Sequence, residues 1–342
     1  MNPLRIGTRD SQLAVWQATL VQGLLKEAGV PSELVYMKSE GDVDTVTPLY
    51  ALGVMGVFTK TLDAALLNNR IDIAVHSMKD VPTQLAQGIQ QAAVLKRASY
   101  KDIFVPAPLP PKGGLADTQA LLDYLFALND AASKGEASEV ANPPLGGRGA
   151  VIATGSVRRI AQWLNRFPNH KVENLRGNVN TRLRKVQDND WNGAIFAAAG
   201  LERIDLRPEK SVDLDWMLPA PAQGAIMVVC REGDDVAFDA CQSFNNDATA
   251  LCTKIERDFL RALMGGCSTP ISALAEVRDG EVIMRGNVVS PDGKKKAEVE
   301  KRIALADAAN LGMTAAKEIL LNGGQEIVDR IRKKGLTADG EA

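Results

Sequence analysis

Two separate stretches of the chain alternate short apolar strands with amphipathic helices, and this alternation limits the possible folds more than any other feature. The first stretch predicts these elements in order: strand 4–8, helix 11–29, strand 33–37, helix 58–70 and strand 71–77. The second stretch predicts strand 150–154, helix 156–167, strand 171–175, helix 178–187 and strand 193–199. Such alternation is typical of parallel sheets in α/β domains.

The order of elements changes from about residue 247. A helix over 247–263, with Asp247 as its expected cap, precedes three strands that begin near residues 271, 281 and 295, with a turn at 291–293. A helix over 307–324 and a frayed, solvated tail over 330–342 follow. This pattern predicts a small α+β domain with an antiparallel sheet.

Two segments are less clearly placed. An apolar strand at 225–230 is compatible with either of the two α/β sheets. Proline and glycine clusters between the α/β regions flank an amphipathic stretch that contains Leu121, Leu125 and Leu128. We interpret this segment as a surface excursion with one helix of its own.

The composition excludes several classes of function. Hydrophobic residues make up 45% of the chain and charged residues 24%, as in ordinary soluble globular proteins, and 342 residues favour two or three domains. No apolar run is long enough to span a membrane, and the first residues lack the apolar core of a signal peptide, so we expect a cytoplasmic protein. A net charge of −2 gives no sign of a nucleic-acid partner. Four cysteines without zinc-site spacing and two histidines predict no metal site.

Polar side chains gather where the predicted strands end. Ligands of open parallel sheets bind at the carboxyl ends of the strands, beside helix starts that favour anions. The residues at these positions are Thr8, Arg9, Ser11, His76, Ser77, Lys79, Asp80, Thr154, Ser156, Arg158, Arg159, Arg176, Asn178, Arg182 and Arg203. If the two domains face each other, these edges form one cationic cleft. No glycine-rich phosphate loop is present, so a ligand with several carboxylates is the better expectation.

Each of these side chains also has a structural interpretation. Asp80 could simply pair with Lys79 or cap the next turn, and single arginines could lie on solvated helix faces. Arginines at four separate strand ends make that second interpretation less attractive. We expect His76 to be packed or hydrogen-bonded rather than a metal ligand, and Cys230 and Cys252 to belong to the core.

Cys267 differs from the other cysteines because it follows a helix end. Gly265 suits the left-handed position that closes such a helix, so Cys267 is predicted on a loop. A thiol on a loop is accessible to reagents and ligands, whereas one on an apolar strand usually is not. This predicted position is a reason to consider Cys267 a reactive residue.

Seven ordered motifs resemble the porphobilinogen deaminase (hydroxymethylbilane synthase) family over about residues 4–335. They are "LRIGTRDSQLAVWQA", "DIAVHSMKDVPT", "ATGSVRR", "LRGNVNTRL", "AAAGLERI", "LPAPAQGA" and "GGCSTPI". The resemblance implies an α/β fold of three domains, two of them like halves of a periplasmic binding protein. It also implies these limits: 1–100 with 222–243 for domain 1, 101–221 for domain 2 with an insertion at about 106–147, and 244–342 for the α+β domain 3.

The resemblance further implies an activity and a cofactor. The family joins four porphobilinogen molecules head to tail with loss of ammonia, and releases the linear tetrapyrrole hydroxymethylbilane by hydrolysis. A dipyrromethane cofactor is held by a thioether to the cysteine of "GGC", here Cys267. Asp80 matches the catalytic aspartate. The residues implied to bind carboxylates are Arg9, Ser11, Ser77, Lys79, Thr154, Ser156, Arg158, Arg159, Arg176, Arg182 and Arg203. We expect a monomer with porphobilinogen as its small-molecule substrate, acting in the porphyrin pathway.

The sequence departs from the family pattern at several positions. The loop "LYALGVMGVFTK" has Ala51 and Met55 where the family usually has two lysines, and Lys38 and Lys60 are the nearest basic residues. Asn180 and Ala222 replace expected glycines. The missing lysines support an alternative, an inactive relative that binds a polycarboxylate. A third and weaker hypothesis is a cysteine hydrolase using Cys267 and His76, but nothing in the sequence places those two side chains together, and the family resemblance argues against it.

Overall fold

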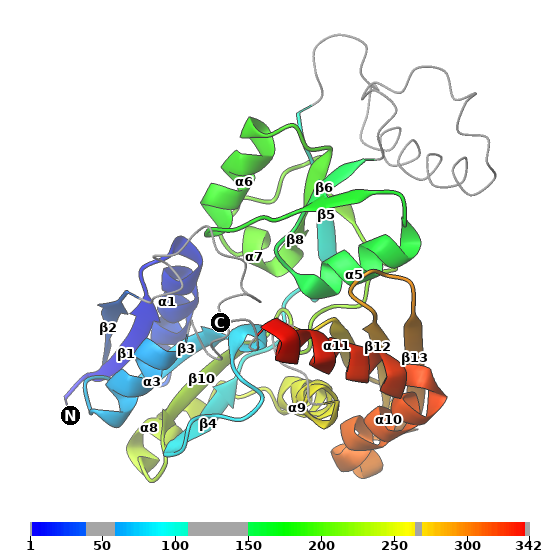
Figure 1. Ribbon diagram of the computed structural model, residues 1–342. Helices are drawn as coiled ribbons and strands as arrows, with labels where there is room; N and C mark the ends of the chain where they lie inside the picture. The colour runs from blue at the N-terminus through cyan, green and yellow to red at the C-terminus, as the bar shows by residue number, and fades with distance from the viewer. Residues whose placement is uncertain (1, 39–58, 109–149, 264–268, 339–342) are drawn as a thin grey trace.

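The computed structural model shows an α/β protein with three sheets (Figure 1). It describes residues 2–38, 59–108, 150–263 and 269–338. Two sheets are five-stranded and the third, near the C-terminus, is a three-stranded antiparallel sheet. Each five-stranded sheet is covered by helices, and we call these two assemblies the first and second lobes. The antiparallel sheet with its helices, from residue 247 onward, is called the C-terminal unit.

The first lobe is built on a sheet with the strand order β2-β1-β3-β10-β4. Its strands are β1 (Leu4–Arg9), β2 (Ser32–Met37), β3 (Ile73–Ser77), β4 (Ile89–Val94) and β10 (Ile226–Arg231). Its helices are α1 (Gln12–Glu27), α3 (Lys60–Leu67) and α8 (Asp235–Gln242). Apolar side chains of α1 and α8 pack on one face of the sheet, and those of α3 pack on the other. Both faces are therefore buried, as the near-continuous apolar strands require.

The second lobe has the strand order β7-β6-β8-β5-β9. Its strands are β5 (Asp102–Pro106), β6 (Val151–Ala153), β7 (Lys171–Glu173), β8 (Gly193–Ala197) and β9 (Val212–Asp213). Its helices are α5 (Val157–Arg166), α6 (Val179–Asp188) and α7 (Ala198–Glu202). Trp163 and Phe167 pack on one face, and Val186 and Leu201 on the other. The predicted excursion at about 106–147 lies almost wholly outside the described residues.

The prediction of parallel sheets is wrong for one strand in each lobe. β1 runs parallel to β2 and β3, but β10 is antiparallel to both β3 and β4, and β5 is antiparallel to β8. The chain crosses between the lobes from β4 to β5 and again from β9 to β10. A strand that arrives from the other lobe starts at the edge where the parallel strands end. It therefore runs in the opposite direction.

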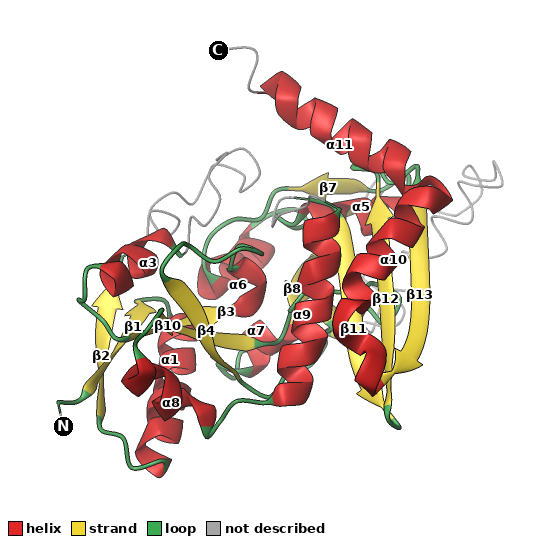
Figure 2. Cartoon of the chain, turned by 90° about the horizontal axis from the view of Figure 1, so that it is seen from below, coloured by secondary structure: helices red, strands yellow, loops and turns green. Residues whose placement is uncertain are grey.

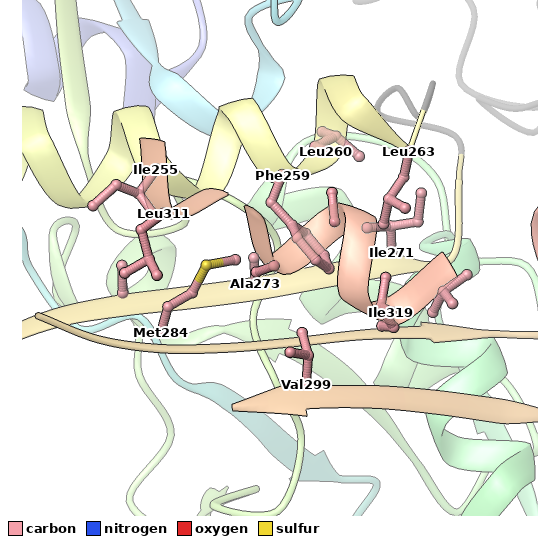
Figure 3. Close-up of a cluster of buried hydrophobic side chains, with 14 of the residues drawn as sticks. Ile255, Phe259, Leu260, Leu263, Ile271, Ala273, Met284, Val299, Leu311 and Ile319 are labelled. Carbon is pink, nitrogen blue, oxygen red and sulfur yellow. The ribbon is translucent and has the colours of Figure 1, made fainter. Parts of the chain in front are cut away.

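The C-terminal unit packs a layer of helices on one face of its sheet (Figure 2). Its strands are β11 (Ile271–Arg278), β12 (Glu281–Val289) and β13 (Lys296–Ala304). Its helical segments are α9 (Asp247–Ala262), η3 (Leu305–Asn310), α10 (Leu311–Ile319), η4 (Leu320–Gly324) and α11 (Gln325–Ala338). The buried cluster between the layers includes Phe259, Met284 and Ile319 (Figure 3).

Two details of this unit differ from the sequence prediction. Asn246 rather than Asp247 caps α9, because its side chain accepts a hydrogen bond from the Thr249 N–H at 2.9 Å. The predicted frayed tail is wrong as far as Ala338, because α11 continues to that residue. Ile327 and Val328 in its first turns are buried against the core, which anchors this helix.

Glu256 on α9 ties both crossings between the lobes to the C-terminal unit. Its carboxylate is fully buried and accepts two hydrogen bonds from Arg97, at 2.6 and 3.0 Å. It also accepts the backbone N–H groups of Ala222, at 2.6 Å, and Ala275, at 2.8 Å. Arg97 lies on the first crossing, Ala222 on the second, and Ala275 on β11. One buried carboxylate thus fixes three segments that are far apart in sequence.

The second lobe also contacts the C-terminal unit, through α5. The buried amide of Gln162 donates to the Leu218 carbonyl and to the Ser272 hydroxyl, both at 3.0 Å, and accepts from Asn287 at 3.3 Å. Asn165 donates to the Gly293 carbonyl in the turn after β12, at 2.7 Å. The C-terminal unit is therefore in contact with both lobes.

Replacing Glu256 by Gln should destabilise the protein. The substitution leaves the largely buried Arg97 guanidinium without its counter-charge, and breaking a buried ion pair costs about 3–5 kcal/mol. Urea unfolding followed by tryptophan fluorescence should show a lower midpoint. Glu298→Gln, at an exposed ion pair with Lys296, is the matched control and should leave the midpoint unchanged. Equal midpoints for the two variants would contradict the structural role of Glu256.

Candidate functional site

The first lobe contributes residues from the ends of β1 and β3. Arg9 is the last residue of β1, and Ser11 precedes α1 without capping it through its hydroxyl. Ser77 ends β3 and is followed by η2 (Met78–Asp80), a single helical turn that carries Lys79 and Asp80. Both are partly exposed. This edge is also where β10 begins after the crossing from the second lobe, since Ile226 pairs with Ser77.

The second lobe contributes residues from the corresponding strand ends. Thr154 follows β6, Ser156 precedes α5, and Arg158 and Arg159 lie in the first turn of that helix. Arg176 follows β7, Arg182 lies in α6, and Arg203 follows α7. The Ser156 N–H donates to the Thr154 hydroxyl at 3.3 Å, and the Ser156 hydroxyl does not cap α5.

Electrostatic effects on pKa values show that the strand-end residues of the first lobe lie close to those of the second lobe. Burial lowers the pKa of Lys79 to about 8, while Asp80 and Asp102 raise it and Arg159 and Arg158 lower it further. Burial likewise lowers the pKa of Arg182 to about 10, with Arg159 and Arg176 acting in the same direction and Asp80 opposing. Asp80 and Lys79 of the first lobe are therefore within electrostatic reach of arginines of the second. We call Lys79, Asp80, Arg158, Arg159, Arg176 and Arg182 the cationic cluster.

Gln223, on the second crossing, links the two lobes at this cluster. Its buried amide donates to the Tyr100 carbonyl at 2.7 Å and to Asp102 Oδ1 at 2.9 Å, and accepts from Lys79 Nζ at 3.4 Å. The same Asp102 oxygen accepts from Arg159 at 2.7 Å. A continuous path therefore joins Lys79 to Arg159. The motif "LPAPAQGA" contains Gln223, but sequence reasoning gave it no role because its partners come from distant segments.

Several of the predicted carboxylate-binding arginines have internal partners, and Arg182 Nε, for example, donates to the Gly177 carbonyl at 2.7 Å. Arg159 is 7% exposed and, besides Asp102, donates to the Ile195 carbonyl at 3.0 Å. Arg203 donates to the Gly224 carbonyl at 2.7 Å, and its guanidinium lies 5.8 Å from the centre of the Trp16 ring. Burial lowers the pKa of Arg203 to about 10. The structure thus brings Arg159 into the cluster but gives Arg203 contacts at the junction of the lobes.

The remaining predicted residues lie around this arrangement. The Ser77 hydroxyl is paired with the buried side-chain amide of Gln17 on α1, at 2.9 Å. His76 is buried, and burial followed by the charge of Arg9 lowers its pKa to about 4, so its ring is neutral near pH 7. Neither His76 nor any other described side chain forms part of a group of residues that could hold a metal ion. Cys267, Ala51 and Met55 lie outside the described residues.

The cysteines that the structure describes belong to the core. Cys230 and Cys252 are buried, as the sequence predicts, and Cys241 is buried with them. Burial raises the pKa of Cys252 to about 11 and that of Cys241 to about 12, so both thiols stay protonated near neutral pH. Among the described helices none has the length and apolar character needed to cross a membrane.

A shallow surface hollow of about 630 Å³ lies at the opposite end of the first lobe. Asn69, Arg231 and Asp234 line it, and Arg231 pairs there with Asp234 and Asp72. Because its opposite charges are paired with one another, this hollow lacks the excess positive charge of the cationic cluster. The cluster is therefore the stronger candidate for a site that binds anions.

Comparison with known protein families shows to which family the chain belongs. Residues 4–239 match the family "Porphobilinogen deaminase, dipyromethane cofactor binding domain", and residues 250–321 match "Porphobilinogen deaminase, C-terminal domain". The chain belongs to the porphobilinogen deaminase family. Its activity is that of this transferase family, EC 2.5.1.61, which uses a dipyrromethane cofactor in tetrapyrrole biosynthesis.

Two solved structures align with most of the chain. An ancestral cationic amino acid solute binding protein aligns with 71% of this chain and 87% of its own, at 14% identity and a TM-score of 0.40. The VFT2 domain of Bordetella pertussis BvgS aligns with 72% of this chain and 90% of its own, at 14% identity and a TM-score of 0.38. The porphobilinogen deaminase assignment rests on the two family matches and not on these alignments.

Asn180, one of the two departures from the deaminase pattern that the structure describes, makes a contact between the lobes. Its side-chain amide donates to Gln12 Oε1 on α1 at 2.9 Å. The other departure, Ala222, has a φ of 63°, in the left-handed region that non-glycine residues usually avoid. The glycine that the family has at this position suits the same backbone conformation.

The lowered pKa of Lys79 predicts a pH-dependent affinity. Lys79 is mostly charged at pH 7 and loses its proton as the pH rises through about 8, so the cluster loses positive charge there. In protein that lacks the cofactor, such as the Cys267→Ser variant, the affinity for porphobilinogen should fall above that pH, because carboxylates bind less well to a neutral amine. Equilibrium binding measured from pH 6.5 to 9.5 would show this fall.

Lys79→Arg is the control for this experiment, because a guanidinium stays charged over the whole range. In the same cofactor-free background, the fall in affinity should be smaller in the Lys79→Arg variant, whereas titration of the substrate's own amine would affect both proteins alike. The same pH profile of affinity in both proteins would exclude Lys79 as the titrating group.

Proposed function

We propose that the cationic cluster is the site where the enzyme binds the carboxylates of the dipyrromethane cofactor and of porphobilinogen. Each pyrrole unit carries an acetate and a propionate, so a growing chain gains negative charge with every addition. The cluster supplies guanidinium and ammonium groups from both lobes. Charge-assisted hydrogen bonds from arginine suit carboxylates because the planar fork can donate two at once. This shared electrostatic environment is the observation that carries the proposal.

The residues present fit a polycarboxylate cofactor. Lys79 and Arg182 both have pKa values lowered by burial and by neighbouring cations, so additional negative charge nearby would favour their protonated forms. Bound carboxylates would supply that charge. Ser77 and Thr154, at the adjoining strand ends, add hydroxyl groups. Arg9, Ser11, Ser156 and Arg203 complete the proposed set, and Cys267 is the proposed attachment point.

Asp80 is the proposed catalytic residue. When bound, the dipyrromethane supplies the nucleophilic pyrrole carbon to which each substrate unit is added. The departing ammonia leaves a positive charge on the substrate, and a carboxylate beside the ring nitrogen stabilises that charge. Asp80 can also assist proton transfer to the leaving amine and accept the proton released from the ring carbon after the new bond forms. The neighbouring cations hold the carboxylates of the cofactor and substrate in place around Asp80.

The alternative, an inactive relative that binds a polycarboxylate, makes a different prediction. An active enzyme carries covalent dipyrromethane, which should give a colour with acidic dimethylaminobenzaldehyde, whereas a plain binder should give none.

We also propose a cytoplasmic monomer and the domain limits given above, 1–100 with 222–243, 101–221 and 244–342. Analytical ultracentrifugation would test the monomer.

Asp80→Asn should retain fold and cofactor but lose most turnover. The amide is nearly isosteric with the carboxylate, yet it carries no charge and cannot accept the ring proton. The loss should be about 10²- to 10⁴-fold, the contribution of a positioned acid–base group. The rate of hydroxymethylbilane formation would measure it, with circular dichroism to confirm folding. Turnover close to that of the unmodified enzyme would remove Asp80 from the mechanism.

Cys267→Ser should abolish thioether attachment. The intact mass of the purified variant should equal that of the polypeptide alone, whereas the unmodified protein should carry the added mass of two pyrrole units. Cys241→Ser is the matched control and should keep the adduct, because Cys241 is buried in the first lobe. An adduct that persists in Cys267→Ser would refute this attachment point.

A further inference from the structure

The turn that carries Lys79 and Asp80 has little rigidity of its own. η2 contains only Met78–Asp80, and the Val81 N–H closes it by donating to the Met78 carbonyl at 3.2 Å. A single helical turn fixes several backbone dihedrals for one hydrogen bond, so it is unfavourable in isolation. The backbone of Asp80 must therefore be held from outside if its carboxylate is to keep one position.

Arg257 on α9 supplies that external support. Its Nη1 donates to the Val81 carbonyl at 2.9 Å and approaches the Met78 carbonyl at 3.4 Å. Its Nη2 donates to the Pro82 carbonyl at 2.6 Å. The guanidinium thus bridges carbonyl groups on both sides of Asp80 in the chain. A planar, permanently charged fork is suited to hold several carbonyls in a fixed arrangement.

The helix that presents Arg257 is itself firmly anchored. The preceding residue, Glu256, is fully buried and binds both crossings between the lobes. α9 also packs against β4 of the first lobe and β11 of the C-terminal unit, and Figure 2 shows it beside β11. Arg257 therefore ties the η2 turn of the first lobe to a helix that is itself fixed in place.

We propose that Arg257 is a positioning residue for Asp80. It acts on the backbone of the turn and thereby fixes where the carboxylate stands relative to the cationic cluster. The proposal rests on the catalytic role proposed above for Asp80. It also gives α9 a second task, because that helix ends at Ala262, five residues before Cys267 in the sequence. One helix then determines the position of the acid and leads into the segment that bears the attachment point.

A purely structural role for Arg257 makes a different prediction. If the residue only joined two domains, its loss would lower stability and the occupancy of cofactor, and the fully loaded protein would turn over normally. If it positions Asp80, loaded and folded enzyme should have a lower kcat with little change in KM, because carboxylate binding depends on other residues. The split between kcat and KM therefore distinguishes the two roles.

The first experiment compares three variants of the holoenzyme. Arg257→Gln removes the charge and most of the fork, and Arg257→Lys keeps the charge with a single donor group. Arg261→Gln, one turn further along α9, is the matched control, since Arg261 is 55% exposed and pairs only with Asp258 among the contacts described. Intact mass gives the cofactor occupancy, thermal unfolding gives the folded fraction, and rates are expressed per loaded enzyme.

The expected loss in Arg257→Gln is about 10- to 100-fold in kcat, the effect of misplacing a reacting group by about 1 Å. KM should change by less than about threefold, which is much smaller than a tenfold change in binding affinity. Arg257→Lys should recover part of the rate, and Arg261→Gln should match the unmodified enzyme. If Arg257→Gln does not fold, the lysine variant carries the test, with a partial loss of kcat expected. A kcat within twofold of normal in loaded, folded Arg257→Lys and Arg257→Gln would overturn the proposal, as would a loss that only follows cofactor occupancy.

A double-mutant cycle with Asp80→Asn separates this proposal from the role of Asp80 itself. The addition of the first pyrrole unit per loaded enzyme, followed over hours by intact mass, gives a rate even for slow variants. If Arg257 acts through Asp80, Arg257→Gln should have little further effect once Asp80 is Asn. A full additional loss in that background would contradict the positioning role. A normal rate for Asp80→Asn alone would instead refute the catalytic role of Asp80, whatever Arg257 does.

Discussion

The desolvation of neighbouring cations at the strand ends of the two lobes is the constraint on which the rest of this structure depends. Lys79 and Arg182 approach the other arginines of the cluster from opposite lobes, and the pKa values of both are lowered because burial and neighbouring positive charges disfavour the protonated forms. Asp80 and Asp102 offset part of this cost. We propose that a ligand with many carboxylates adds negative charge that favours the protonated forms.

The scaffold holds this unfavourable arrangement together by polar contacts at the crossings between the lobes. Gln223 joins Lys79 to Asp102 and so to Arg159, and the buried Glu256 binds Arg97 and the backbone of Ala222. These contacts come from segments that also connect the two lobes in sequence. α9 carries both Glu256 and Arg257. Under our proposals, the C-terminal unit both bears the cofactor and, through its first helix, holds the turn that carries Asp80.

Much of the fold and part of the site follow from local sequence patterns. Strand and helix alternation gives both lobes, and the ends of their strands give Lys79, Asp80 and most of the arginines, because parallel strands end at one edge. The direction of β10 and β5 depends on the chain crossing between lobes, which no local pattern records. The same holds for Gln223 and Arg257, whose partners are distant in sequence. Ala222 shows the limit of local preference, since a buried backbone hydrogen bond to Glu256 accompanies its left-handed conformation.

The central claim is that cofactor carboxylates neutralise the cationic cluster, and the protonation of Lys79 reports this directly. NMR titration of the Lys79 side chain would compare the protein with and without covalently attached dipyrromethane. Without the cofactor, the pKa should lie near the value of about 8 that burial and the neighbouring arginines impose. With the cofactor attached, the account predicts a clear rise toward the value of an ordinary lysine. An unchanged or lower pKa in the loaded protein would contradict it.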